Sequence, residues 1–168
     1  MFKEISGDLF DSTDSLVHCI SRDLCMGKGI ACVFKSKFGG VNELRQQGKF
    51  QFFYCIPYFL KQLYDNILSK YRILLWSGAV VGGVAVLVRH NRFIYNMITK
   101  ERYYNKPTLS MLNESLVAVR SHCLKHNVTR LSMPRIGCGL DGLNWLNVSR
   151  LIQDVFADTN VDITVYVK

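Results

Sequence analysis

The sequence predicts a single α/β domain in which helices cover both faces of a central sheet. Strand-like runs alternate with helical patterns along the chain, which is the order expected of a layered α/β domain. Two glycine-containing loops follow predicted strands and lead into helices, as binding loops do at the carboxyl ends of strands in such folds. The length of 168 residues suits one domain with a sizeable core and is short for two.

The first part of the chain predicts two strands and a helix. Polar and apolar residues alternate over Phe2–Ser6, and Ser15–Ile20 is a short apolar run, so both are expected to be strands. The loop Met26–Ile30 then leads into a helical pattern over Ile30–Lys37. Because the first amides of a helix have no partner within it, this glycine loop is a natural anion site.

The second part predicts four strands and two helices. The strands are expected at Val84–Val88, Phe93–Thr99, Arg130–Met133 and Ile163–Val167, and the helices after the capping residue Thr108 and from about Trp145 to Phe156. In the first of these helices apolar residues recur at helical spacing from Leu109 to Cys123, and Lys125 lies at its end.

The segment Leu131–Asp141 joins a strand to a glycine-containing loop that ends on a carboxylate. Gly137 and Gly139 allow a tight bend that presents bare N–H groups to a phosphate, and the Asp141 carboxylate could act as an acid or base beside that phosphate. The same pattern also fits a simple turn in which Asp141 caps the next helix. The pattern alone favours neither interpretation.

The net charge of +8 indicates affinity for polyanions, such as nucleic acids or phosphorylated small molecules. The chain has no run of five basic residues and no stacking motif of an RNA-binding sheet, which argues against a dedicated nucleic-acid module. The first residues mix acids with apolar residues and show no secretory segment, so we expect an intracellular protein.

The spacing of cysteines and histidines gives no metal motif. The six cysteines form no C-x-x-C pair, and we expect them to be reduced, buried thiols, with Cys138 packing in its loop. His122 and His126 lie four residues apart and could share a metal, but no third ligand is evident, so surface positions are favoured. We therefore expect neither a metal nor an organic cofactor.

Residues 50–80 differ in composition from both flanks. They hold nine of the twenty aromatic residues and one acid, Asp65. Lys61, Asp65, Lys70 and Arg72 interrupt the segment, so no uncharged run reaches the ~18 residues that a membrane helix needs. We therefore expect no membrane span here.

Taken together, the motifs resemble the macrodomain family, and within it the lysine-based hydrolases that remove terminal ADP-ribose from proteins. The motifs that carry the resemblance are Gly7–Phe10, His18–Ser21, Met26–Ala31, Phe38–Val41, Leu131–Asp141 and Ile163–Tyr166. The resemblance runs from about residue 2 to 47 and from about 82 to 166. It implies one three-layer α/β/α macrodomain over residues 1–168, with a mixed central sheet and an atypical insertion at about 50–80.

The resemblance also implies an ADP-ribose cleft and the residues that line it. Asp8 and Leu9 match the positions that receive the adenine, and Tyr166 lies near the adenine side. One wall, at the phosphates and distal ribose, is matched by Ser21, Gly27, Lys28, Gly29 and Ile30. The other wall is matched by Pro134, Arg135, Ile136, Gly137, Cys138, Gly139 and Leu140.

The lysine-based subgroup places its catalytic pair at positions matching Lys100 and Asp141. Other macrodomain hydrolases have asparagines where this chain has His18–Ser21, which points away from their water-activating mechanism. A neutral lysine amine can form a covalent adduct with the opened sugar, and Asp141 would be the general base. Without the resemblance, Lys100 beside Glu101 and Arg102 would be read as solvated surface.

The implied activity is removal of mono-ADP-ribose from glutamate and aspartate side chains, together with deacetylation of O-acetyl-ADP-ribose. The alternatives are a reader that binds ADP-ribose without chemistry and a product inactivated by the insertion. The implied partners are ADP-ribosylated proteins, with poly-ADP-ribose or modified nucleic-acid ends as further candidates. We expect a monomer in the nucleoplasm and nucleolus, with some in the cytoplasm, in the setting of the DNA damage response.

The insertion has two interpretations. Gly48–Phe50 can be encoded by GGT AAG TTT, which contains a splice donor, and Ala79-Val80 by GCA GTT, which contains an acceptor. Phe50–Val80 could therefore be a translated intron. The rival interpretation is a genuine insertion that binds a partner. Sequencing the transcript across Gln47 to Gly83 separates the two.

Overall fold

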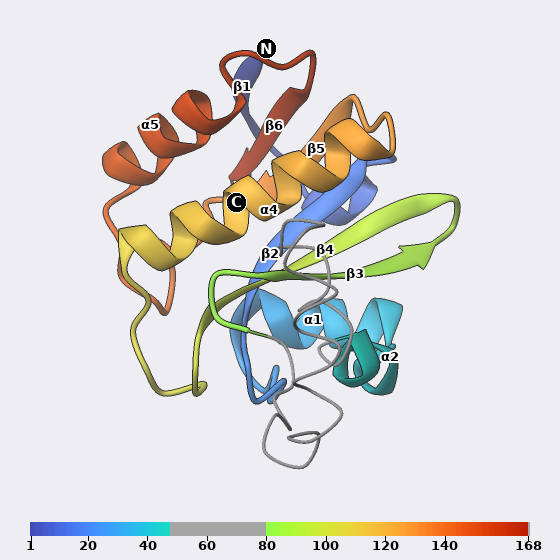
Figure 1. Ribbon diagram of the computed structural model, residues 1–168, viewed down its shortest axis with the longest axis vertical. Helices are drawn as coiled ribbons and strands as arrows, with labels where there is room; N and C mark the ends of the chain where they lie inside the picture. Colours follow the sequence, from blue (N-terminus) through green and yellow to red (C-terminus); the bar gives the residue numbers. More distant parts are fainter. Residues whose placement is uncertain (48–79, 168) are drawn as a thin grey trace, which may run out of the picture.

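The computed structural model describes residues 1–47 and 80–167 (Figure 1). The strands are β1 (Phe2–Ser6), β2 (Ser15–Ser21), β3 (Val84–Arg89), β4 (Arg92–Lys100), β5 (Arg130–Pro134) and β6 (Asp162–Val167). The helices are the 3-10 helix η1 (Leu9–Asp11) and α1 (Gly29–Phe38), α2 (Val41–Gln47), α4 (Leu109–Lys125) and α5 (Trp145–Phe156). Both interpretations of the insertion at about 50–80 concern a segment that lies, except for its last residue, outside the described residues.

The strands form one mixed sheet in the order β1-β6-β5-β2-β4-β3. Every neighbouring pair is parallel except β3 and β4, which are antiparallel. Parallel strands end at the same edge, so the carboxyl ends of five strands meet along one side of the sheet. This edge is where the predicted site residues gather.

Two apolar clusters lie on opposite faces of the sheet, which makes the fold three layers thick. On one face α4 and α5 contribute Leu112, Leu116, Val148 and Ile152, all fully buried. On the other face α1 and α2 contribute Phe34 and Leu44. Figure 1 shows these two pairs of helices separated by the sheet. The predicted α/β/α architecture with a mixed sheet is confirmed.

The element boundaries lie close to those that the sequence predicts. The structure differs from the sequence predictions in one strand end, one additional short helix and the exposure of two cysteines. Strand β4 extends one residue further than predicted at its carboxyl end, through Lys100. The sequence pattern did not reveal η1, in which the amide of Phe10 donates to the carboxylate of the N-cap Asp8 at 3.0 Å. The expectation of buried thiols is wrong for Cys25 and Cys32, which are exposed.

Within the described residues, no helix has the length and apolar character needed to cross a membrane.

His18 lies at the centre of β2 and is fully buried. Its Nε2 is 2.7 Å from Asn96 Oδ1, and its ring stacks on Phe34 with the centroids 3.8 Å apart. Burial lowers the pKa of His18 to about 4, against a partial opposing effect of the hydrogen bond to Asn96. The folded protein therefore holds His18 neutral at pH values where the unfolded chain is protonated.

We expect the free energy of unfolding to fall as the pH is lowered from about 6.5 to about 4, by roughly 3 kcal/mol from His18 alone. The sign follows because only the unfolded chain takes up the proton in this window. Urea unfolding at a series of pH values measures the effect. His18→Gln should flatten the curve in this window, whereas His90→Asn, at an exposed turn, should not; an unchanged curve in His18→Gln would contradict the account.

Candidate active site

The predicted site residues converge on the carboxyl edge of the sheet. Ser21 ends β2 opposite Lys100 at the end of β4, and Pro134 ends β5 opposite Tyr166 of β6. Asp8 follows β1 by two residues. Segments that are far apart in the sequence thus meet at one edge, in the order set by the sheet.

Lys100 and Asp141 are in direct contact. Lys100 Nζ lies 2.5 Å from Asp141 Oδ1, and each side chain is 13% exposed. Lys100 is therefore not a solvated surface residue. Asp141 is not a helix cap either, because the N-cap of α5 is Asn144, which accepts from the amide of Asn147. A charge-assisted contact this short is strong and sets the geometry of both groups.

The loop that carries Asp141 is held by its own backbone. The amide of Cys138 donates to Arg135 O at 3.2 Å, and the amide of Leu143 donates to Gly137 O at 2.9 Å. Ile136 is only 2% exposed and anchors the loop in the core. Gly137 has φ +71°, and a β-carbon there would lie 2.8 Å from Leu143 Cδ1. Glycine adopts this backbone angle without strain, and a β-carbon would in addition force the end of the Leu143 side chain to shift.

We expect Gly137→Ala to lower the free energy of unfolding by about 1–3 kcal/mol, because it adds both backbone strain and a clash. Gly139→Ala is the matched control, since a β-carbon there would meet nothing within 4 Å. Chemical denaturation of the two variants measures the difference. Equal stability of Gly137→Ala and Gly139→Ala would show that the loop does not depend on this turn.

The loop between β2 and α1 is organised by Asp23. Its carboxylate accepts from Ser21 Oγ at 2.5 Å and from the amides of Cys25 at 3.2 Å and Tyr103 at 3.0 Å. Burial opposes ionisation, but these hydrogen bonds hold the pKa of Asp23 below its usual range. The spacing of Ser21 and Asp23, which is typical of a side-chain-stabilised turn, is the signal in the sequence for this arrangement.

The same loop has an unusual backbone that exposes its glycines. Leu24 and Met26 have φ values of +54° and +44°, and both side chains are buried. Non-glycine residues adopt this conformation at a cost, so the surrounding contacts hold it. Gly27, Lys28 and Gly29 are left exposed at the start of α1.

The two glycine loops are adjacent. A β-carbon on Gly29 would lie 3.2 Å from Leu140 Cδ1, so the start of α1 touches the loop after β5. Lys106 Nζ donates to Leu140 O and ties in the loop after β4. Leu140 itself is 66% exposed. The two predicted walls thus touch each other beside Asp141, the residue that follows Leu140 and contacts Lys100.

Two residues predicted to line the second wall have side chains that are already engaged. The guanidinium of Arg135 donates to Glu4 Oε2 at 3.1 and 2.9 Å and lies over the ring of Trp145. The hydrogen bond from the Trp145 indole N–H, and to a lesser extent the contact with Arg135, hold the pKa of Glu4 below its usual range. Ile136 packs in the core. Ile136 would therefore contact a ligand only through its backbone, whereas the Arg135 side chain is paired but still 47% exposed.

At the β1 end of the edge, Tyr166 lies beside Gly7. A β-carbon on Gly7 would be 3.7 Å from the Tyr166 ring. Leu9 is 3% exposed and packs in the α1 cluster, while Asp8 caps η1. The three residues assigned to the adenine by resemblance are thus neighbours.

The thiols near the site are poor nucleophiles. Burial, followed by the charge of Asp141, raises the pKa of Cys19 to about 12. Burial also raises the pKa of Cys138, whose Sγ donates to Ile136 O at 3.3 Å. Neither group forms a thiolate readily, which agrees with the packing role expected for Cys138.

The histidine pair on α4 belongs to a different part of the molecule. The rings of His122 and His126 stack with their centroids 4.1 Å apart, and His122 Nδ1 lies 3.0 Å from Tyr95 Oη. His122 is half-buried, so the surface position favoured for it is only partly correct. In the described ranges, no group of three or more potential ligands could hold a metal ion.

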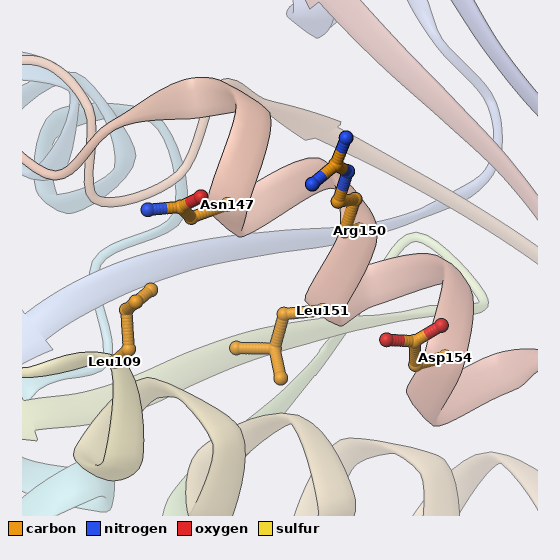
Figure 2. A pocket seen from close by; sticks show the side chains of 5 residues that line it. All are labelled: Leu109, Asn147, Arg150, Leu151 and Asp154. Atoms are coloured by element: carbon orange, nitrogen blue, oxygen red, sulfur yellow. The ribbon is translucent and has the colours of Figure 1, made fainter.

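A hollow of about 280 Å³ lies between α4 and α5 (Figure 2). It is lined by Leu109, Asn147, Arg150, Leu151 and Asp154. None of these is a predicted site residue, so this hollow is separate from the Lys100–Asp141 pair.

Solved structures with the same fold cover the whole chain. The macrodomain of Thermus aquaticus DarG superimposes with a TM-score of 0.70 at 21% identity, covering 100% of this chain and 99% of that chain. Thermosipho africanus DarTG in complex with ADP-ribose has a TM-score of 0.70 at 19% identity, covering 99% of this chain and 41% of that chain. No family model matches the sequence.

Two sequence relatives are 49% identical over 164 residues, covering 96% of this chain and 88% of each relative. Together with the fold, this similarity shows that the chain belongs to the macrodomain family. The two relatives are the ADP-ribose glycohydrolase OARD1 of Bos taurus and of Homo sapiens.

Proposed function

We propose that this protein is a hydrolase that releases ADP-ribose from glutamate and aspartate side chains and deacetylates O-acetyl-ADP-ribose. The observation that carries the proposal is the 2.5 Å contact between Lys100 and Asp141, beside two glycine loops that could hold a diphosphate. Its sequence relatives are named ADP-ribose glycohydrolases, which supports the same chemistry here.

In this proposal ADP-ribose lies along the carboxyl edge of the sheet. The adenine rests by Asp8, Leu9 and Tyr166, next to β1 and β6. The diphosphate accepts from amides of the loops at 27–30 and 137–140, where exposed glycines let the backbone approach an anion. The distal ribose then reaches the end of β4, where Lys100 lies.

The chemistry proceeds through the lysine amine. The proton on Lys100 Nζ has a direct route to Asp141 Oδ1 across the 2.5 Å contact. The neutral amine attacks the anomeric carbon, the bond from that carbon to the ester oxygen breaks, and the carrier leaves as a carboxylate. Asp141 passes the proton that it took from Lys100 to solvent and is ionised again. It then deprotonates a water that attacks the adduct; the carbon–nitrogen bond breaks, ADP-ribose leaves, and the proton on Asp141 returns to the lysine.

A reader without catalytic activity is the second candidate. The partly buried contact between Lys100 and Asp141 favours the hydrolase, because a reader needs no amine at the sugar. Nuclear residence, a monomeric state, and activity on poly-ADP-ribose or modified nucleic-acid ends are further parts of the proposal.

Two measurements test the function. Thermal unfolding with ADP-ribose should show a higher Tm than with AMP, because only ADP-ribose spans the edge from Tyr166 to Lys100. A protein ADP-ribosylated on glutamate should release free ADP-ribose. Binding without release would support the reader instead, and no shift with ADP-ribose would contradict both candidates.

A further inference from the structure

The loop at 101–106, between β4 and α4, presents an exposed pair of tyrosines. It begins directly after Lys100, and all six of its residues are exposed. Tyr103 is 58% exposed and Tyr104 is 68% exposed. Their rings meet edge to face, with the centroids 5.2 Å apart and the planes at 83°. Tyrosine is enriched at recognition surfaces because its ring is apolar and its hydroxyl can hydrogen-bond.

This loop is held in place despite its exposure. The amide of Arg102 donates to Asn105 Oδ1 at 2.9 Å, and the amide of Asn105 donates back to Arg102 O at 3.0 Å. The amide of Tyr103 donates to Asp23 Oδ2, and Lys106 donates to Leu140 O. The backbone of the loop that carries the tyrosines is therefore tied to both glycine loops, which lowers the entropy cost of binding to it.

The position of the loop along the sheet edge indicates what it would meet. In the proposed orientation, ADP-ribose runs from β1 and β6, past β5 and β2, to the anomeric carbon at β4. The group esterified to that carbon must then continue beyond Lys100, where the loop at 101–106 begins. An acetyl group is too short to extend far along the loop at 101–106, whereas a polypeptide continues on both sides of the modified residue and can lie against this loop.

We propose that Tyr103 and Tyr104 form a recognition surface for the polypeptide that carries the ADP-ribose, and so favour modified proteins over O-acetyl-ADP-ribose. This inference rests on the proposed function. The tyrosine rings would pack against the carrier backbone and the side chains that flank the modified acid. Their edge-to-face arrangement gives a compact, amphipathic surface of the kind that contacts peptides.

A polypeptide suits this surface better than a nucleic-acid strand. Nucleic-acid surfaces combine stacked aromatic rings with free cations that track the phosphates. Here Arg22 is paired with Glu101 at 3.0 Å, and Lys106 is engaged with Leu140 O. Arg22 and Lys106 are thus already engaged within the protein, and Arg102 is the exposed cation next to Tyr103.

The test compares two substrates that share ADP-ribose and differ only in the leaving group. In the Tyr103→Ala/Tyr104→Ala variant we expect kcat/KM for a glutamate-ADP-ribosylated polypeptide to fall about tenfold or more. Turnover of O-acetyl-ADP-ribose should stay unchanged. Val88→Ala, at a 60% exposed position on β3, is the control and should alter neither substrate. Thermal unfolding checks that each variant is folded.

The outcomes separate this inference from the proposed function. An equal loss on both substrates, or no loss on either, overturns the inference while the hydrolase proposal stands. A loss confined to an ADP-ribosylated oligonucleotide overturns it in favour of a nucleic-acid surface. Binding can also be measured without turnover, in the Lys100→Met background, as the ratio of the affinity for the modified polypeptide to the affinity for free ADP-ribose. Adding the two tyrosine substitutions should abolish any gain in affinity that the polypeptide gives. An unchanged ratio contradicts the inference.

Discussion

Lys100→Met is expected to reduce kcat for release of ADP-ribose from glutamate by about 10³-fold or more, because it removes the nucleophile of the proposed mechanism. Methionine is unbranched and only one heavy atom shorter than lysine, so the packing around this position should be largely kept. Affinity for ADP-ribose, measured by calorimetry, should change much less, since the loops that would hold the diphosphate are intact. Single-turnover kinetics with a modified protein measures the chemical step directly.

The control for this change is Lys3→Met, at an exposed position of β1. It removes the same charge without touching the site and should leave kcat unaltered. If Lys100→Met also retained full turnover, the amine would have no role in the reaction. A loss of ADP-ribose binding equal to the loss of turnover would instead make Lys100 a binding residue.

Asp141→Asn is expected to lower kcat by about 10²–10⁴-fold, the usual contribution of a general base. Asparagine has nearly the same shape, but it cannot take a proton from the amine or from water. The substitution also leaves the Lys100 ammonium without its 2.5 Å partner, so stability should be measured alongside activity. ADP-ribose binding should persist.

The double variant Lys100→Met/Asp141→Asn sharpens this second prediction. Groups that act as one catalytic unit lose activity together, so the double variant should be about as slow as the slower single variant. Losses that multiply would show that Lys100 and Asp141 act in independent steps.

The layered fold could be predicted from local patterns. Alternating residues in β1, the apolar run in β2 and the helical repeat in α4 each indicate their own element. In β2 and α4 the apolar residues of the pattern are largely buried, whereas β1 has no fully buried residue. The 3-10 helix η1 was missed, since three residues carry too little periodicity to be recognised.

The candidate site was only partly predictable. Motifs placed Ser21, Gly29 and Gly137 in loops that follow strands, and the parallel sheet brings such loops to one edge. Which side chains touch depends on register, including the irregularity between Ile20 and Ser21 that aligns Ser21 with Lys100. Pairing of this kind joins distant segments and leaves no local signal.

The roles of Asp23 and Lys106 show the same limit. Both are polar residues in exposed loops, where sequence alone favours solvation. Their partners are the amide of Tyr103 and the carbonyl of Leu140, backbone groups from distant segments that no side-chain pattern identifies. These contacts tie the loop after β4 to both walls of the site.

The central claim is that Lys100 attacks the sugar carbon, and trapping the adduct tests it most directly. The adduct opens to an imine that a borohydride reduces to a stable amine. Mass spectrometry of digested protein, after reaction with a glutamate-ADP-ribosylated substrate and the reductant, should find ADP-ribose on the peptide that contains Lys100 and none in Lys100→Met. Full turnover with no adduct on Lys100, or an adduct only on exposed lysines such as Lys28, would contradict the account.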